Sequence, residues 1–287
     1  MGPKRPRNAG HSPTRRIFLG LIVLIVTLLL LSIVVFPFYW ILIGSLKTET
    51  ELFEIPPTFF PKMVTLMNYQ KVYAGDFFKC LVNSLIIAFL STAIALILAA
   101  PAAYVFSRSR YLWLRMVFFV IMTVRMLPPV SLTVPMYLMF RALGLHNTRL
   151  ALAISHLTWQ IPFVVWMLES HFRGIPSELE EAAQIDGCSR ILALAHIILP
   201  LAAPGLSVAA IFAFITSWNE FPLALVLTST TAAKTATVNI AETITSYQIF
   251  WGQMMASGII FAFPVMFFSL FVQRYLIETL ITGSVKE

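Results

Sequence analysis

The chain has 287 residues, of which 59% are hydrophobic and only 11% are charged. A soluble domain averages about 45–50% apolar and about 25% charged residues, so this composition excludes an ordinary soluble protein and favours a membrane protein in contact with lipid. The net charge of +7 does not indicate binding to nucleic acid, because the basic residues lie near the ends of apolar runs and not in one patch.

The first 16 residues, MGPKRPRNAGHSPTRR, form a basic tail, and an apolar run over about 17–43 follows it. This run is far longer than the core of a signal peptide, which has roughly 7–15 residues, and no small-residue cleavage site follows it. We therefore expect a disordered cytoplasmic tail over 1–16, a retained first transmembrane helix, and a single membrane domain over 17–287.

Further apolar runs follow along the chain, and each is long enough to cross a hydrocarbon core of about 30 Å as a helix. A helix is expected because a backbone in lipid must satisfy its own hydrogen bonds, and neighbouring helices can then heal the kinks that prolines cause. The sequence thus predicts an all-α membrane protein, a bundle of six transmembrane helices over about 17–43, 81–106, 113–138, 150–171, 202–227 and 253–275.

The basic residues predict how this bundle is oriented. Six spans place both termini on one side of the membrane, and that side holds twelve of the 20 Lys and Arg residues, whereas the other side holds seven and Arg125 lies inside a span. Because basic residues favour the cytoplasmic side, both termini are expected there. Two long loops, 44–80 and 228–252, then lie outside, the first as an irregular cap. Cys80 and Cys188 fall on opposite sides in this topology, so no disulfide is expected between them.

The inner connection over 172–201 is unusually polar for this chain. The sequence SELE predicts a capping box with Ser177 as the N-cap and Glu180 three residues later. Gly187 is placed to end this helix in a left-handed conformation. A second short helix is expected to follow, with one apolar face formed by Ile191, Leu194, Ala195 and Ile198.

Two interpretations of this segment follow from its residues. Leu179, Ala182 and Ala183 share one face of the first helix, and a surface of small residues ringed by acids fits the cleft of a partner protein. The alternative is an interfacial helix that only links two spans. The residue pattern is compatible with both.

The stretch EAAQIDGCSRILALAHIILP resembles the EAA signature of the membrane subunits of binding-protein-dependent ABC importers. That signature has Glu-Ala-Ala, three residues, Gly, nine residues and Ile-x-Leu-Pro, which here fall on Glu181, Ala182, Ala183, Gly187, Ile197, Leu199 and Pro200. The stretches SLKTETELF, SWNEFPLAL and QRYLIETLITGSVKE are similar to the sugar-importer branch. The whole pattern resembles the six-span permease of the maltose-transporter type.

This resemblance implies a type I ABC importer permease in the cytoplasmic (inner) membrane of a prokaryote, which moves a sugar by alternating access. The segment 176–200 would be a cytoplasmic coupling helix between spans 4 and 5 that docks on an ATPase, and the tail over 283–286 would reach toward the ATPase dimer. The implied partners are a second homologous permease subunit, two ABC ATPase subunits and an extracytoplasmic solute-binding protein. The implied coupling residues are Glu180, Glu181, Ala182, Ala183, Asp186, Gly187, Ile197, Leu199 and Pro200.

Several catalytic and cofactor motifs do not occur in the sequence. There is no GxxxxGK[ST] stretch, so ATP and Mg²⁺ are expected on the partner ATPase and not on this chain. HExxH, GxSxG and paired-cysteine patterns do not occur either, and the five histidines have no metal-ligand spacing. We therefore expect a transport subunit that is not an enzyme and holds no cofactor or metal.

Two polar sites inside the predicted spans are candidates for a substrate path. Arg125 lies near the middle of the third span, where a charge is costly and should face a partner or a water-filled cavity; the alternative is a structural salt bridge. Asn219 and Glu220 lie in the fifth span, and the alternative for them is that they brace the bundle. An ion-coupled secondary transporter is the competing function, but it would need more titratable groups at mid-membrane and usually an inverted repeat.

Overall fold

The computed structural model describes the backbone of residues 13–284 and the side chains of residues 18–270. Most of the predicted basic tail and the last residues of the predicted ATPase-directed tail lie outside that range. Within it, all regular elements are helical, apart from an isolated bridge pair. They are α1 (Pro13–Ser45), α2 (Glu49–Leu52), α3 (Met67–Ala74), α4 (Phe77–Arg108), α5 (Leu112–Val124), α6 (Pro129–Ala142), α7 (Arg149–Arg173), α8 (Glu178–Ile185), α9 (Arg190–Ala193), the π-helix η1 (Leu194–Ile198), α10 (Leu199–Leu201), α11 (Ala203–Trp218), α12 (Pro222–Leu227), α13 (Ala236–Ala241) and α14 (Trp251–Ser284).

Helix length and composition make this a multi-pass membrane protein. Among the described residues, four helices, α1, α4, α7 and α14, are each long and apolar enough to cross a membrane. Two bent pairs could each add a span: α5 with α6, at 96°, and the segment Arg190–Leu201 with α11, at 80°. Up to six spans are therefore present, and two of them differ from the straight helices that the sequence predicted.

The third predicted span, 113–138, is wrong as a single helix. α5 stops at Val124 and α6 starts at Pro129 in a very different direction. The sequence MLPP explains the break, because a residue before proline is pushed toward extended backbone and proline has no N–H for the helical ladder. Pro128 is accordingly extended, with ψ 131°. The prolines within α1, α4, α7 and α14, by contrast, lie inside continuous helices.

The fifth predicted span, 202–227, is also interrupted. α11 ends at Trp218, and α12 begins only at Pro222, which occupies its first turn. Phe221 lies between them with non-helical backbone, φ −129°. This break places Asn219 and Glu220 at a junction between two helices and not on the wall of one continuous helix.

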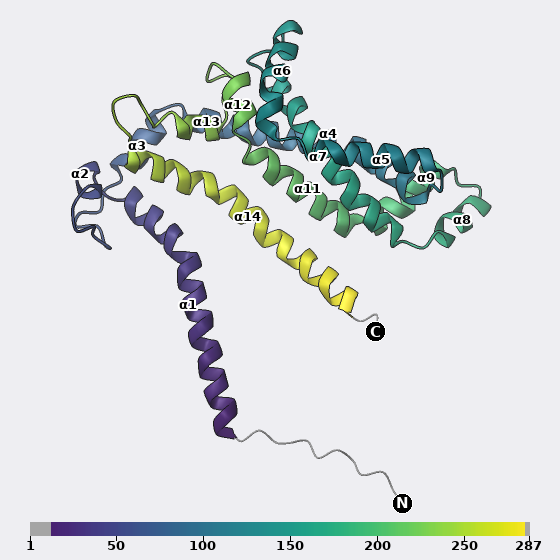
Figure 1. Cartoon of the computed structure of the whole chain (residues 1–287), viewed down its shortest axis with the longest axis horizontal. Helices are drawn as coiled ribbons and strands as arrows, with labels where there is room; N and C mark the ends of the chain where they lie inside the picture. Colours follow the sequence, from purple (N-terminus) through teal and green to yellow (C-terminus); the bar gives the residue numbers. More distant parts are fainter. Residues whose placement is uncertain (1–12, 285–287) are drawn as a thin grey trace, which may run out of the picture.

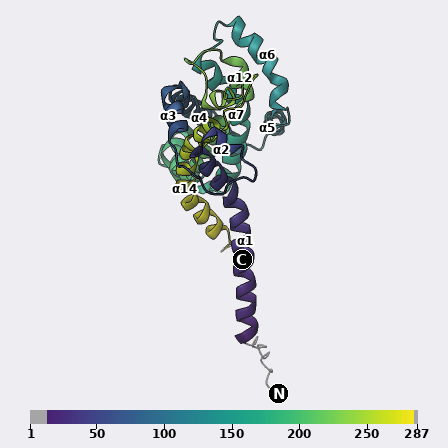
Figure 2. The same ribbon diagram turned by 90° about the vertical axis from the view of Figure 1, so that its left-hand side faces the viewer.

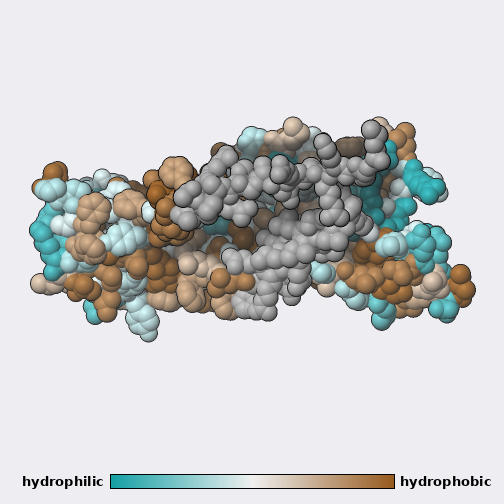
Figure 3. Space-filling model, turned by 90° about the horizontal axis from the view of Figure 1, so that it is seen from below, coloured by the Kyte–Doolittle hydropathy of each residue, from teal (hydrophilic) through white to brown (hydrophobic). Residues whose placement is uncertain are grey.

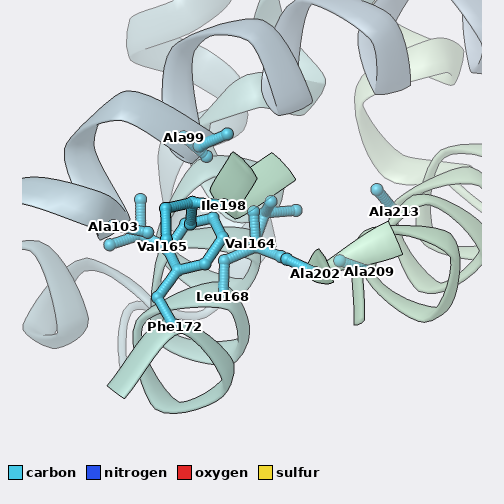
Figure 4. Close-up of a cluster of buried hydrophobic side chains, with 11 residues drawn as sticks. Ala99, Ala103, Val164, Val165, Leu168, Phe172, Ile198, Ala202, Ala209 and Ala213 are labelled. Carbon is cyan, nitrogen blue, oxygen red and sulfur yellow. The ribbon is translucent and has the colours of Figure 1, made fainter. Parts of the chain in front are cut away.

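The core of the bundle is formed by α4, α7 and α11, with the segment from α9 to α10 packed on their end. Figure 4 shows the buried side chains where these elements meet, and many of them are alanines, such as Ala99, Ala103 and Ala209. Small residues let helices approach closely in a membrane, where van der Waals packing drives their association. α4 and α7 therefore run against each other over much of their length.

α14 packs on α11, where the Phe261 ring stacks on Trp218, whereas most of α1 lies apart from the core (Figures 1 and 2). α1 extends away as a long arm that packs on α14 near its own C-terminal end. The apolar window of its span is 0% buried within the chain. An apolar helix of this length needs lipid or another protein around it.

Figure 3 shows hydrophilic surface residues gathered toward both ends of the molecule, beside hydrophobic patches. α2, α3 and α13 gather at one end and α8 lies at the other (Figure 1). At the first end, the Lys62 backbone N–H and the Thr58 hydroxyl both donate to the Glu51 carboxylate at 2.9 Å. These hydrogen bonds, that from Lys62 first, lower the pKa of Glu51, so the predicted irregular cap is tied by specific contacts.

Candidate functional site

α8 is the first helix of the predicted coupling segment. Ser177 occupies its N-cap position, but the backbone there is helical and the side chain makes no capping hydrogen bond. An N-cap side chain normally reaches the first turn from extended backbone. The predicted capping box is therefore wrong, and the Glu180 side chain binds α4 instead.

The end of α8 agrees with the prediction. Gly187 has φ +86°, the left-handed region that favours glycine. Its N–H donates to the Gln184 carbonyl at 3.1 Å, and the next N–H, that of Cys188, donates to the Ala183 carbonyl at 2.9 Å. This pair of bonds is a Schellman motif, and it turns the chain sharply into α9.

The apolar face of the second short helix differs from the prediction. The five residues of η1 form a π-helix, in which the N–H of Leu199 donates to the carbonyl of Leu194. Because a π-turn bonds residues five apart, the inner face falls on Ala193 and Ile198, which are both buried. The expected face of Ile191, Leu194, Ala195 and Ile198 is wrong for Ile191 and Ala195, which are both exposed.

Arg108, the last residue of α4, joins three helix ends. Its Nε donates to Glu180 Oε1 at 2.6 Å, its Nη1 to the Phe172 carbonyl at 3.0 Å, and its Nη2 to the Ile175 carbonyl at 3.0 Å. The Tyr104 hydroxyl donates to the other carboxylate oxygen of Glu180 at 2.7 Å. Such a charge-assisted cluster of hydrogen bonds is geometrically specific, so α8 is held against the ends of α4 and α7.

The predicted coupling residues separate into two sets by burial. One set faces solvent and is available to another protein: Glu181, Ala182, Asp186, Gly187 and Pro200. The other set packs inside this chain: Glu180, Ala183, Ile197 and Leu199. The two alanines of the motif therefore point in different directions, and only Ala182 can touch a partner directly.

A cavity of about 1340 Å³ opens beside α8. The ends of α4 and α7, the start of α5 and the α8–α9 turn line it, and its basic residues are Arg108, Arg110, Arg115, Arg173 and Arg190. Like charges gathered at one opening raise the local potential. This end of the bundle is therefore electropositive around an acidic helix.

Arg125 lies where α5 ends, at the break before α6. Its Cζ lies 4.6 Å from the centroid of the Phe163 ring, a cation–π contact, and Phe163 in turn packs edge-on against Phe212 at 5.6 Å. Among the residues whose side chains are described, no ion pair includes Arg125. The structural salt bridge that was the alternative for Arg125 is not observed there.

Asn219 and Glu220 hold the junction between α11 and α12. The two carboxylate oxygens of Glu220 accept the N–H groups of Leu223 and Ala224 at 2.7 and 3.0 Å, which caps α12. The Asn219 amide donates to the Ile215 carbonyl at 3.0 Å. The Glu220 contact joins α11 to α12 and fits bracing, which was the alternative to a role in the path, whereas the Asn219 bond stays within α11.

A buried polar network crosses the centre of the bundle. The Oγ of Ser217 lies 2.6 Å from Nδ1 of His156 and accepts from the Ser91 hydroxyl at 3.1 Å, and the Gln160 amide donates to Ser91 at 3.1 Å. Nε2 of His156 is 3.5 Å from the Glu220 carboxylate. Because unpaired polar groups are costly in a membrane, this network fixes α4, α7 and α11 in one register.

Comparison with known proteins identifies the class of this molecule. Residues 91–281 match the family described as binding-protein-dependent transport system inner membrane component. The chain belongs to this family. It is a permease, a membrane subunit that is not itself an enzyme, and the ATPase of such a system is a separate protein.

Curated permeases are similar to almost the whole chain. It is 37% identical over 252 residues to the sulfoquinovosyl glycerol transport system permease protein SmoH of Agrobacterium fabrum, with 88% of each chain covered. It is 38% identical over 253 residues to the trehalose transport system permease protein SugB of Mycobacterium tuberculosis, covering 87% of this chain and 92% of the relative. With the trehalose/maltose transport system permease protein MalG of Thermococcus litoralis the identity is 34% over 270 residues, covering 92% and 96%.

A solved structure shares the fold of this permease. A chain from the crystal structure of a bacterial ABC transporter involved in the import of the acidic polysaccharide alginate superimposes with a TM-score of 0.79 at 22% identity. The match covers 92% of this chain and 98% of that chain. The fold is therefore that of an ABC importer permease.

Sequence reasoning missed two residues at the end of the permease that carries α8. Arg108 was counted only among the basic residues that predict the orientation of the bundle in the membrane, and Tyr104 was not considered. Their contact with Glu180 spans 72 and 76 positions of the chain, and no local pattern marks such a pair. The one available signal was that Arg108 and Glu180 both lie at cytoplasmic ends of the predicted topology.

Proposed function

We propose that this permease is the membrane subunit of an ATP-driven importer for a di- or oligosaccharide or a related carbohydrate, in the cytoplasmic membrane of a prokaryote. The observation that carries the proposal is the exposed edge of α8, with Glu181, Ala182 and Asp186 facing away from the bundle at its electropositive end. The relatives named above transport sugars or sugar derivatives by their names, which supports the substrate class.

The exposed edge of α8 serves as the docking surface for an ATPase. Its carboxylates suit basic residues on that partner, and Ala182 allows the partner's backbone to come close. In this proposal α8 and both termini are cytoplasmic, two ATPase subunits bind ATP and Mg²⁺, and their closure moves α8. ATP can switch the bundle between inward- and outward-facing states only because it binds those states unequally.

A second homologous permease subunit completes the membrane part. The main support is α1, because the apolar window of its span is 0% buried within this chain. The second subunit covers part of that arm and lipid covers the rest. The opposite end, with α2, α3 and α13, then faces an extracytoplasmic solute-binding protein that delivers the sugar.

The sugar path passes Arg125 in this proposal. A guanidinium offers several N–H donors to hydroxyl groups, and Phe163 beside it offers an aromatic face. Because Glu220 holds the α11–α12 junction and the Asn219 amide bonds the end of its own helix, we assign Glu220 a bracing role, place Asn219 outside the path and keep Arg125 as the path residue.

The test is to tag this chain in its native host, purify it in mild detergent, and identify the proteins that accompany it in stoichiometric amounts. A P-loop ATPase and a second permease are expected, and the complex in vesicles should take up sugar only with ATP and the solute-binding protein. A chain that purifies alone and transports along an ion gradient without ATP would overturn the proposal in favour of a secondary transporter.

A further inference from the structure

We propose that Arg108 is a positioning residue that makes α8 and the α4–α7 pair move as one body. In this view Glu180 is an internal anchor of the coupling helix and is not part of the surface that touches the ATPase. The inference rests on the proposed function of α8 and adds the route by which movement of α8 reaches the membrane bundle.

The geometry at Arg108 supports a rigid joint. The guanidinium is a planar fork whose donors keep fixed directions, and here they reach Glu180 in the first turn of α8, the Phe172 carbonyl in the last turn of α7, and the Ile175 carbonyl just beyond it. Arg108 itself ends α4. Displacing one of the three helix ends therefore breaks hydrogen bonds to the same cation unless the other two follow.

Both carboxylate oxygens of Glu180 already accept hydrogen bonds from residues of this chain. Arg108 occupies one carboxylate oxygen and Tyr104 the other, and the residue is 6% exposed. The neighbouring acids, Glu178 and Glu181, are exposed. A carboxylate intended for a partner should resemble those neighbours, so the inward orientation of Glu180 indicates a task inside the permease.

Other links between α8 and the membrane helices are weaker. The backbone of α8 packs mainly on α9 and η1, whereas α4 and α7 pack closely on each other. Within the described part of the chain, the side-chain hydrogen bonds from α8 to transmembrane helices all converge on Glu180. A force applied to α8 therefore passes to α4 chiefly through this carboxylate.

Arg173 provides a matched control. Arg173 is the last residue of α7, as Arg108 is the last residue of α4. Both are cations, and both line the cavity beside α8. The ion pair of Arg173, however, joins Glu169 on its own helix, and its side chain is 64% exposed. Removing Arg173 changes the charge of the region without cutting a link between helices.

The experiment measures the sugar taken up per ATP hydrolysed by the complete complex in vesicles, for the wild type and for Arg108→Gln, Glu180→Gln, Tyr104→Phe and Arg173→Gln. We expect Arg108→Gln and Glu180→Gln to assemble and hydrolyse ATP but to lose about tenfold in this ratio, because each leaves a partly buried charge without its partner. Tyr104→Phe keeps the packing and loses one hydrogen bond, so its ratio should fall less. Arg173→Gln should match the wild type.

Each result decides between the two proposals. A wild-type complex whose uptake ignores ATP contradicts the proposed function itself. If the wild type is coupled and assembled Arg108→Gln and Glu180→Gln complexes keep its ratio, the anchor is overturned and the proposed function stands. An equal fall for Arg173→Gln also overturns the anchor, since charge alone would then explain the effect. If the Arg108→Gln complex fails to assemble, the sugar taken up per ATP hydrolysed by the Glu180→Gln and Tyr104→Phe complexes tests the anchor in its place.

Discussion

Arg125 shows how a single residue could serve a permease without belonging to its core. It is exposed within this chain, at the end of α5, and its contact is with an aromatic face. A cation over a ring is held in place but keeps hydrogen-bonding capacity for a passing ligand. Its charge is therefore placed for transient contacts.

For Arg125→Ala we expect sugar uptake by the reconstituted complex to fall by at least about tenfold, since a hydrogen bond from a charged group is worth about 1.5–3 kcal/mol and each step of about 1.36 kcal/mol is a factor of ten. Assembly with the partners should be unchanged. Uptake of labelled sugar measures the first and subunit stoichiometry the second. Arg141→Ala, at an exposed arginine in the last turn of α6, is the control and should transport normally. Normal uptake by an assembled Arg125→Ala complex would contradict a place in the path.

Gly205 tests packing at the residue scale. A Cβ at this position would lie 2.6 Å from the ring of His171, so Gly205→Ala must displace that ring. Overpacking of this kind costs about 1–3 kcal/mol, and the midpoint of thermal unfolding in detergent should fall by several degrees. Gly258→Ala is the control, because a Cβ there meets nothing within 4 Å; its midpoint should stay or rise. Equal midpoints for the two variants would refute the close contact.

At the scale of elements, the turn after α8 depends on one backbone angle. Gly187 has φ +86°, and nothing lies within 4 Å of the position of an added Cβ, so strain alone decides the effect of a substitution. Gly187→Val should loosen the end of α8 and reduce both ATPase binding and uptake. Gly187→Asn should keep both, since asparagine tolerates left-handed backbone. Co-purification of the ATPase at graded salt measures the difference, and identical retention with both variants would count against a role of this turn.

The elements that the sequence predicted well are those governed by local rules. Long apolar runs gave α1, α4, α7 and α14, and the Gly187 turn followed from the special backbone freedom of glycine. The break after Arg125 was present in the sequence as MLPP, but two prolines in an apolar run are also compatible with a kink that neighbours heal. The direction of α6 depends on tertiary packing and was therefore not predictable from that run.

The proposed coupling site shows the same difference between local pattern and tertiary contact. The motif residues lie on and after α8, a short helix at one end of the bundle, whereas their orientation was not determined by sequence. The capping box failed because Arg108 attracts Glu180, and the apolar face of the second helix shifted because η1 adds a residue to its turn. Both causes are contacts or local geometries that single-sequence periodicity does not encode.

At the scale of the whole molecule, α1 is the feature that this chain alone does not explain. Its exposed side chains include Val23 and Leu30. We expect a photo-crosslinking amino acid at Leu30 to capture the second permease subunit in the assembled complex. The same group at Phe214, which is buried against Trp218 and Phe268, should give no adduct between chains. Mass spectrometry of the crosslinked bands identifies the captured protein, and adducts with lipid alone from both Val23 and Leu30 would contradict this arrangement.

The polar chain through Ser91, Ser217 and Gln160 also sets an order for biogenesis. α4 is synthesised first and enters the membrane with Ser91 bonded only to its own helix, at the Ala88 carbonyl. The partners of Ser91 arrive later, with α7 and then α11. Until both have been inserted, the unfinished bundle exposes polar groups that lipid cannot satisfy. A chain that stalls before α11 therefore leaves polar side chains without their partners inside the bilayer, where membrane chaperones and proteases can recognise them.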